Sequence, residues 1–259
     1  MLQSDAPVRY FSNTKNALLA VAASISNCGD RLEKFLKGQD LDGVLPPSLV
    51  KLPYLKMMSI TGNNLSGPIP SYLGKVTTLT YLSLESNLFS GRVPPELGNL
   101  VNLEYLNLNA NNLTGELPIA LTDLTKLTEL RISSNNFTGK IPDFFQSWKQ
   151  LHKLEIQASG LEGPIPSSIS VLSSLTELRI SDLLGEGSKF PNLSSMTSMT
   201  RLDLSFNRLE GNVPDFQGLS QLEYIHEDLS YNNFSESSAL STCRDTLNLF
   251  QSFSGQNNL

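Results

Sequence analysis

Leucine recurs along this chain at a fixed interval of 24 residues. The recurring positions are Leu55, Leu79, Leu103, Leu127, Leu151, Leu175 and Met199, with Leu222 following after 23. Each begins the pattern L-x-x-L-x-L-x-x-N-x-L-x-G-x-I-P, which is clearest over residues 103–118. A partial earlier copy runs from Leu41 to Pro46. Equal periods with the same residue types in phase indicate an internal repeat, because chance does not produce six in succession.

Each repeat predicts one short strand, a turn and a return segment. The L-x-L pair alternates with period two, so its leucines face the same, inward side. The asparagine at the ninth position leaves the strand, and its amide can bond backbone groups that a buried turn would otherwise leave unpaired. Those asparagines are Asn63, Asn87, Asn111, Asn135 and Asn207. The glycine that follows permits an unusual backbone shape, and the proline starts the return.

The fold expected from this pattern is an α/β-type repeat solenoid, a right-handed leucine-rich-repeat superhelix with a concave parallel β-sheet. One repeat cannot bury its leucines alone, so neighbouring repeats stack and share one core. We expect the repeat domain over residues 35–236, a leader or N-terminal cap over 1–34, and a C-terminal cap or tail over 237–259. The apolar run Ala17–Ala23 fits a weak signal segment, a capping helix or an unstructured leader.

Three repeats depart from the pattern. Ser159 stands where the fifth repeat should have asparagine. Residues 181–188 lack both the asparagine and the Gly-x-Ile-Pro segment, so we expect the stack to loosen or bulge there. The last repeat returns to phase if two residues near His226 and Glu227 are removed, which indicates either a bulge or an error at an exon boundary.

The residues that alternate with the inward leucines face outward from the predicted sheet. In the first three repeats they are Met57, Ser59, Thr61, Tyr81, Ser83, Glu85, Tyr105, Asn107 and Asn109. In the later repeats they are Glu129, Arg131, Lys153, Glu155, Glu177, Arg179, Arg201 and Asp203. The charges of the later set alternate from strand to strand, which favours cross-strand ion pairs. They either neutralise one another and support the sheet, or form a polar docking face for a charged ligand.

Met57, Tyr81 and Tyr105 form a second candidate surface on the same face. Exposed aromatic side chains are frequent anchors for peptides and partner proteins, although tyrosine also favours strands on its own account. The candidate partner-binding residues are therefore Met57, Tyr81, Glu85, Tyr105, Asn107, Arg131, Lys153 and Arg179.

Charge, hydropathy and cysteine content exclude several functional classes. The net charge of −6 argues against nucleic acid as a partner, because phosphate binding requires a basic face. The sequence has no run of 18 apolar residues, so it contains no candidate membrane helix. Cys28 and Cys243 bracket the repeats, and eight strand steps would separate them by roughly 40 Å, too far for a disulfide.

Five N-x-[ST] sequons occur, at Asn64, Asn112, Asn136, Asn192 and Asn233. They suggest N-glycosylation in a secretory compartment. The alternative is that they arise for structural reasons, because N-N-L-[ST]-G is itself the repeat consensus.

Nothing in the sequence predicts catalysis, a metal site or a cofactor. His152 and His226 lie in different repeats, so they predict neither a catalytic nor a metal-binding pair. The segment Gly185–Gly187 lacks the context of a phosphate loop, and no kinase signature is present. Trp148 precedes Leu151 by three residues, a slot filled elsewhere by leucine or valine, and is predicted to lie in the core.

Several segments resemble known plant proteins. The motifs Leu65–Pro70 and Leu161–Pro166 look like the plant-specific class of leucine-rich repeats. Leu36–Leu49, and Leu178–Leu184 with Phe190–Leu193, resemble the ectodomains of plant receptor-like serine/threonine kinases of leucine-rich-repeat subfamily VIII. A malectin-like domain, a membrane span and a kinase usually follow in that family and are not present in this sequence. The family's usual cysteine pair before the first repeat is also not evident, because only Cys28 remains.

The resemblance implies an extracellular module that binds a peptide or protein ligand, a co-receptor ectodomain, or both. It would lie at the outer face of the plasma membrane or in the apoplast, and would be attached to the membrane only through a segment missing here. The chain itself is not expected to be an enzyme. The alternatives are a stand-alone secreted inhibitor resembling the polygalacturonase-inhibiting proteins, and a catalytic protein whose kinase lies beyond this sequence.

Overall fold

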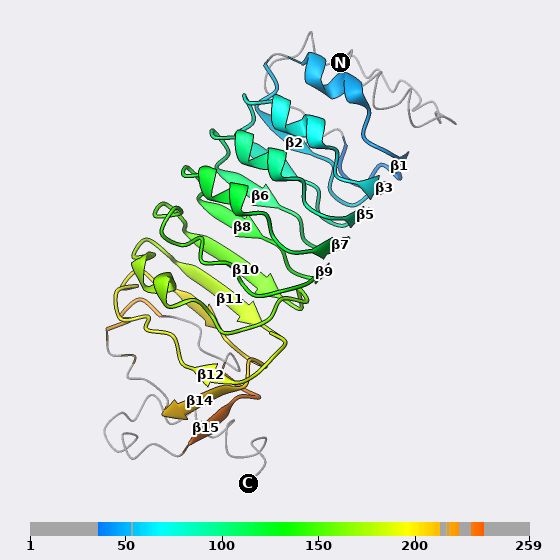
Figure 1. Ribbon diagram of the computed structural model, residues 1–259. Helices are drawn as coiled ribbons and strands as arrows, with labels where there is room; N and C mark the ends of the chain where they lie inside the picture. Colours follow the sequence, from blue (N-terminus) through cyan, green and yellow to red (C-terminus); the bar gives the residue numbers. More distant parts are fainter. Residues whose placement is uncertain (1–35, 53, 213–215, 217, 223–228, 236–259) are drawn as a thin grey trace, which may run out of the picture.

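The computed structural model describes residues 36–52, 54–212, 216, 218–222 and 229–235 as a stack of repeats (Figure 1). The seven repeats that begin at Leu55 to Met199 each contribute one strand to a seven-stranded parallel sheet. In chain order the strands are β2 (Met57–Ser59), β4 (Tyr81–Ser83), β6 (Tyr105–Asn107), β8 (Glu129–Arg131), β10 (Lys153–Gln157), β11 (Glu177–Ser181) and β13 (Arg201–Asp203). This confirms the expected leucine-rich-repeat fold.

The inward column of apolar residues runs through the whole sheet in register. Met58 pairs with Leu82, and Leu106, Leu130, Leu154, Leu178 and Leu202 follow on successive strands. All of them are buried in one continuous apolar core. The stacked interior therefore arises because the same residue type returns to the same place in every coil.

A second, lateral sheet lies beside the first and was not predicted from the sequence (Figure 1). Its five parallel strands are β1 (Asp42–Gly43), β3 (Asn64–Pro68), β5 (Leu88–Gly91), β7 (Asn112–Gly115) and β9 (Asn136–Phe137). Two isolated β-bridges, from Glu162 to Lys140 and from Glu162 to Leu184, extend this side of the molecule. A three-stranded sheet of β12 (Ser188–Lys189), β14 (Leu209–Asn212) and β15 (Asn233–Ser235) follows it.

Short 3-10 helices form five of the return segments in the described residues, and each begins directly after a proline. They are η1 (Pro47–Lys51), η2 (Ser71–Lys75), η3 (Pro95–Asn99), η4 (Ile119–Asp123) and η5 (Ser167–Val171). Gly74 is required where η2 meets η3, because a Cβ there would lie 2.1 Å from the Glu96 carbonyl oxygen.

An aromatic cluster occupies the return segment of the fourth repeat. Trp148 is buried against Phe144 and Phe145, with ring centroids 5.1 and 6.4 Å away. Its indole Nε1 donates a hydrogen bond to the Leu121 carbonyl oxygen at 3.1 Å. The prediction that Trp148 belongs to the core is confirmed.

A ladder of asparagine side chains ties consecutive repeats together. The Asn87 Oδ1 accepts from the Leu65 N–H at 3.2 Å, and its Nδ2 donates to the carbonyls of Ile60 and Leu84 at 2.9 and 3.1 Å. The other members of this ladder are Asn63, Asn111, Asn135, Asn207 and Asn232. The amide role predicted for the ninth position is therefore confirmed.

The expected loosening at residues 181–188 is confined to the lateral side. In the seven-stranded sheet β11 pairs with both β10 and β13, so the stack is continuous there. The Leu183 N–H still donates to the ladder residue Asn207 at 3.2 Å. The interruption falls between the bridge at Leu184 and the start of β12 at Ser188, where Gly185–Gly187 intervene.

Some predictions concern residues outside the described parts of the chain. These are the leader with Ala17–Ala23 and Cys28, the tail with Cys243, and the two-residue insertion near His226 and Glu227. Within the described residues, no helix has the length and apolar character needed to cross a membrane.

Candidate functional site

The outward face of the seven-stranded sheet brings the predicted aromatic residues together. Met57 pairs with Tyr81, and Tyr81 with Tyr105, on three successive strands. The two tyrosine rings stack with centroids 4.1 Å apart and planes 5° from parallel. All three side chains are partly exposed. They therefore form an apolar platform on a rigid sheet.

Small polar side chains lie around this platform and are buried. The hydroxyl of Thr61 lies 3.1 Å from that of Ser59 and 2.8 Å from that of Ser83. Asn107, predicted as a contact residue, is only 1 % exposed. Its Nδ2 donates to the Tyr105 hydroxyl at 3.2 Å, and its Oδ1 accepts from the Asn109 N–H at 2.9 Å. Asn107 therefore positions Tyr105. Glu85 lies beyond the end of β4 and is partly exposed.

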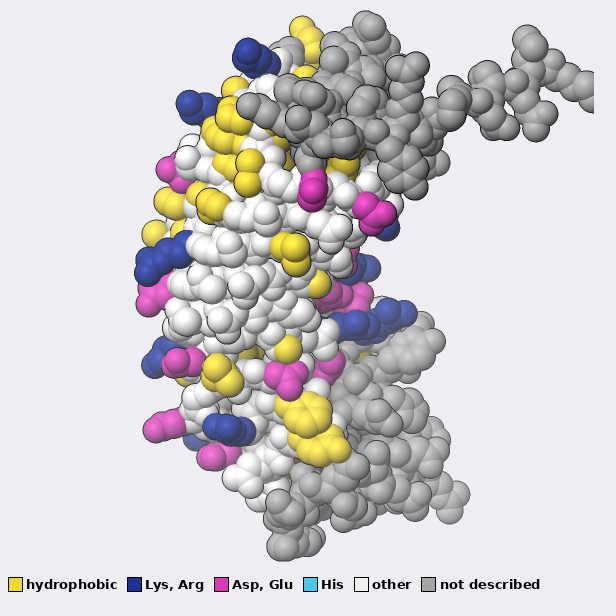
Figure 2. Space-filling model, turned by 90° about the vertical axis from the view of Figure 1, so that its right-hand side faces the viewer, with side chains coloured by type: hydrophobic (Ala, Val, Ile, Leu, Met, Phe, Trp, Pro, Cys, Tyr) yellow, Lys and Arg dark blue, Asp and Glu magenta, His cyan; other side chains and the backbone are white. Residues whose placement is uncertain are grey.

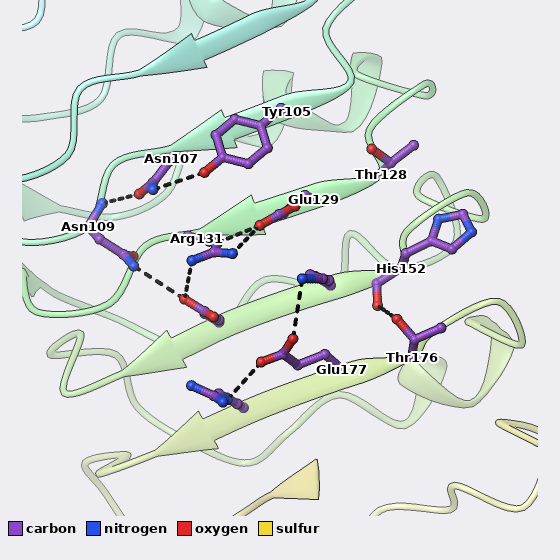
Figure 3. Close-up of polar contacts among 12 residues, drawn as sticks. Tyr105, Asn107, Asn109, Thr128, Glu129, Arg131, His152, Thr176 and Glu177 are labelled. Carbon is purple, nitrogen blue, oxygen red and sulfur yellow. Dashed lines mark hydrogen bonds and ion pairs between the residues drawn. The ribbon is translucent and has the colours of Figure 1, made fainter. Parts of the chain in front are cut away.

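Arg131 occupies the middle of the face, between two carboxylates (Figure 3). Its guanidinium lies 2.5 Å from Glu129 Oε1 and 3.6 Å from Glu155 Oε2. Burial by itself lowers the pKa of Arg131, but the charges of Glu155 and Glu129 outweigh it, so the pKa is raised. Glu155 also accepts a hydrogen bond from Asn109 Nδ2 at 3.3 Å. Arg131 is therefore a fixed cation, already paired.

A second ion-pair network centres on Glu177 (Figure 3). Its carboxylate lies 3.0 Å from Arg179 Nε, 3.5 Å from Lys153 Nζ and 4.0 Å from Arg201 Nη1. The Glu177 side chain is 9 % exposed, against 39 % for Lys153 and 35 % for Arg179. The carboxylate is thus recessed beneath the cations.

The geometry of the two networks favours the interpretation that the charges neutralise one another and support the sheet. Three of the five ion pairs join neighbouring strands, as the alternating pattern predicts. The other two, Arg131–Glu129 and Arg179–Glu177, lie within one strand and were not predicted. Such partly exposed pairs contribute at most about 1 kcal/mol each.

A row of threonines at the start of the strands was missed by the sequence reasoning. The Thr176 hydroxyl donates to the His152 carbonyl at 3.0 Å (Figure 3), and the Thr128 hydroxyl donates to the Glu104 carbonyl at 2.9 Å. Thr80 and Thr200 make the same contact to the preceding repeat. Their spacing of 24 or 48 residues could have revealed this row. The exposed His152 contributes its backbone to it.

The site has the chemistry of a binding surface. It offers stacked aromatic rings, paired charges and fixed amides on a rigid sheet. Among the residues that the structure describes, no three His, Cys, Asp or Glu side chains gather as a metal site. A leucine-rich-repeat fold of this kind is not itself catalytic.

The five sequon asparagines are all exposed. Four of them open strands of the lateral side: Asn64 begins β3, Asn112 begins β7, Asn136 begins β9 and Asn233 begins β15. Asn192 lies in a separate loop, where its Oδ1 accepts hydrogen bonds from the N–H and the hydroxyl of Ser194.

Comparison with known proteins agrees with this architecture. Residues 37–187 match the family described as leucine-rich repeat region, and residues 198–219 match the family described as Leucine Rich Repeat. None of the curated proteins matches the chain.

Solved ectodomains of plant receptors are similar to the chain. The ectodomain of the Arabidopsis thaliana receptor kinase GASSHO1/SCHENGEN3, in complex with CASPARIAN STRIP INTEGRITY FACTOR 2, is 33 % identical with a TM-score of 0.69, over 78 % of this chain and 24 % of that one. The plant peptide hormone receptor RGFR1, in complex with RGF2, is 36 % identical with a TM-score of 0.69, over 75 % and 31 %. The Arabidopsis receptor kinase HAESA, in complex with the peptide hormone IDA and the co-receptor SERK1, is 32 % identical with a TM-score of 0.66, over 75 % and 37 %.

The chain therefore spans between 24 % and 37 % of the length of these three receptor chains. The repeat period, the in-register leucine core, the asparagine ladder and the match over residues 37–187 agree with one another. The chain belongs to the leucine-rich-repeat family.

Proposed function

We propose that this chain is the ligand-recognition part of the ectodomain of a plant receptor-like serine/threonine kinase of leucine-rich-repeat subfamily VIII. It acts at the extracellular face of the plasma membrane and binds a peptide or protein ligand, a co-receptor ectodomain, or both. The similarity to receptors solved with peptides supports this role. The segments Leu36–Leu49 and Leu178–Leu184 support the subfamily.

The observation that carries the proposal is the stacked pair Tyr81 and Tyr105. Aromatic side chains supply much of the binding free energy at protein interfaces. Both rings are held by neighbouring strands, so little side-chain entropy is lost when a ligand binds. Recognition is by surface complementarity, with no chemical step in this chain.

The charged half of the sheet suggests that the ligand also carries an acidic side chain. Lys153 lies two strands beyond Tyr105, about 10 Å away at the ordinary strand spacing. Three residues of an extended peptide cover about that distance. The favoured ligand has an apolar side chain over the tyrosines and an acidic one about three residues away, near Lys153 and Arg179. Both cations pair with Glu177, but their side chains remain 39 % and 35 % exposed above its recessed carboxylate.

Binding of secreted plant peptides tests the proposal. A synthetic library of such peptides is screened against residues 1–259 produced through a secretory pathway. We expect binders whose affinity falls at least tenfold, about 1.4 kcal/mol, in the double variant Tyr81→Ala, Tyr105→Ala. Tyr54→Ala is the matched control, because this tyrosine is 88 % exposed and lies outside the sheet. Equal affinity of the double variant and the wild type would remove the tyrosine platform from the function.

The full-length transcript tests the architecture. An in-frame malectin-like domain, membrane span and kinase downstream of Leu259 are expected for the receptor. A stop codon together with paired cysteines would favour the secreted inhibitor instead.

A further inference from the structure

One position of the repeat, directly before the ladder asparagine or the residue that replaces it, has left-handed backbone in successive repeats. In six of them the residue is glycine, alanine, serine or aspartate, namely Gly62, Ser86, Ala110, Ser134, Ala158 and Asp182. The last two described repeats instead carry Phe206 and Tyr231 there, with φ 53° and 57°. Bulky side chains rarely adopt this conformation. The backbone at this position therefore does not favour the two aromatic residues.

Phe206 and Tyr231 form a second stacked aromatic pair, at the C-terminal end of the described repeats. Their ring centroids are 4.1 Å apart, and the ring planes are 12° from parallel. The two residues are 44 % and 45 % exposed, and neither belongs to the apolar core. The rings therefore present aromatic surface to solvent on a fixed part of the fold.

The second face of the Phe206 ring is directed toward the preceding repeat, because Tyr231 covers the first. Asp182 holds the equivalent position in that repeat. The register of β11 and β13 pairs Arg179 with Asp203, and its continuation places Asp182 opposite Phe206, about 5 Å away at the ordinary strand spacing. The side chain of Asp182 is too short to continue the stack of rings. A ligand group can therefore lie on the free face of Phe206, next to the carboxylate.

Asp182 is exposed and brings a negative charge to this ring face. Its Oδ2 accepts a hydrogen bond from the Ser181 hydroxyl at 2.7 Å, and it makes no ion pair within the described residues. The guanidinium of Arg208 is held elsewhere, because its Nη1 donates to the Gly185 carbonyl at 2.6 Å. Figure 2 shows apolar and acidic side chains next to one another at the C-terminal end of the molecule, at the bottom of the view. Because an aromatic face also carries partial negative charge, the carboxylate and the ring together attract a cation.

We propose that Phe206 and Asp182 form a subsite for the guanidinium group of an arginine in the ligand. The inference rests on the proposed function and deepens it, because it names a further residue of the same peptide or protein ligand. A guanidinium is planar, so it stacks on the free face of Phe206 and directs its N–H groups to the carboxylate of Asp182. A lysine ammonium lacks this flat face, so the subsite prefers arginine.

The subsite adds an order of charges to the expected ligand. Arg179 lies within β11 and Asp182 directly follows that strand, so roughly 10 Å of extended chain separates them. An acidic ligand residue at Arg179 and an arginine at Asp182 are therefore about three residues apart in an extended peptide. A peptide with the two charges exchanged meets like charges at both places, which disfavours its binding.

Titration with a blocked arginine tests the subsite without requiring a peptide ligand. The probe is N-acetyl-arginine methylamide, and NMR follows the isotope-labelled phenylalanine and tyrosine rings of residues 1–259. The variants Phe206→Leu and Tyr231→Leu identify the signals of the pair. We expect the probe to shift both signals. The citrulline analogue, which is planar and uncharged, should bind about fivefold more weakly.

Asp182→Asn removes the charge, retains an acceptor for Ser181 and suits the left-handed backbone. It should weaken arginine binding about fivefold. Asp123→Asn, at an exposed position of η4, is the matched control and should leave the affinity unchanged. Ring signals that do not respond to arginine, or an equal affinity in Asp182→Asn and the wild type, overturn the proposal. A response to cellotetraose in place of arginine also overturns it and assigns the ring face to saccharides.

The same titration separates this inference from the proposed function. Arginine binding at Phe206 and Asp182 in a protein that binds no peptide of the library supports the subsite and contradicts the proposed function. Peptide binding through Tyr81 and Tyr105, without any response of the Phe206 ring to arginine, supports the proposed function and overturns the subsite.

Discussion

The hydroxyl of Ser159 accepts a hydrogen bond from the backbone N–H of Leu161 at 3.3 Å. In regular repeats the equivalent N–H donates to the asparagine of the following repeat, as Leu65 does to Asn87. The following repeat here has Leu183 in place of asparagine. The two departures from the pattern therefore compensate, because the serine satisfies the N–H that the missing asparagine would have bound.

Ser159→Ala should lower the free energy of unfolding by about 1–3 kcal/mol, because it leaves a buried N–H without an acceptor. Urea unfolding measures the effect. Thr138→Ala is the control, since Thr138 is exposed and its side chain makes no hydrogen bond within the described residues; a change within about 0.5 kcal/mol is expected there. Equal stability of Ser159→Ala and the wild type would show that the Leu161 N–H has another acceptor.

In unglycosylated protein, the variants Asn111→Ala and Asn112→Ala should differ sharply in their free energy of unfolding. The first removes an amide that bonds three carbonyls and accepts from the Phe89 N–H at 3.1 Å. We expect a loss of about 1–3 kcal/mol, because the buried Phe89 N–H loses its acceptor, while each of the three carbonyls loses one donor and keeps another. The Asn112→Ala variant should unfold with a free energy within about 0.5 kcal/mol of the wild type. Chemical unfolding of the two variants, measured side by side, tests this difference. Similar losses of unfolding free energy would contradict the expectation that Asn111 stabilises the fold and the adjacent Asn112 does not.

Glu177→Gln should destabilise the protein by about 1 kcal/mol, because it removes the carboxylate that Lys153, Arg179 and Arg201 share. The loss should shrink in about 1 M salt, where the screening length falls to about 3 Å. Thermal unfolding at low and high salt measures both effects. Glu104→Gln, at an exposed position, is the control. A loss that does not respond to salt would mean that Glu177 acts through packing alone.

Tyr72 should make stability fall at alkaline pH. Burial raises the pKa of its hydroxyl from the ordinary 10.0 to about 12, and the hydroxyl donates to the Leu45 carbonyl. Because the folded state retains this proton more strongly than the unfolded chain, the contribution is complete below pH 10 and is lost as pH rises through about 12.

The variant Tyr72→Phe isolates this contribution. Its free energy of unfolding should be lower than that of the wild type at neutral pH by about 1 kcal/mol, and the difference should narrow between pH 10 and 12. Tyr54→Phe should leave the profile of the wild type unchanged. A constant difference across this range would show that Tyr72 ionises alike in the folded and unfolded states.

The sequence alone predicted the repeats, the parallel sheet, the leucine core, the asparagine ladder and the burial of Trp148. These features follow from periodicity, because a residue that recurs every 24 positions meets its own counterpart in the next coil. Met58 to Leu202 form one column for that reason. The lateral sheet was not predicted, because its strands share backbone pairing and no distinctive alternation of side chains. The left-handed backbone before each ladder asparagine, as at Ser134 with φ 53°, was also missed, since residues other than glycine occupy it everywhere except at Gly62.

Which outward residues a partner can reach was decided only by the tertiary structure. Tyr105 and Asn107 are two residues apart on one strand, yet the tyrosine is partly exposed and the asparagine is buried. Glu177 and Arg179 likewise share a face, but the carboxylate is recessed and the guanidinium is not. The order of residues determines which side of the sheet they occupy. Their exposure depends on how far side chains of different lengths reach across neighbouring coils, and that distance exists only once the coils are stacked.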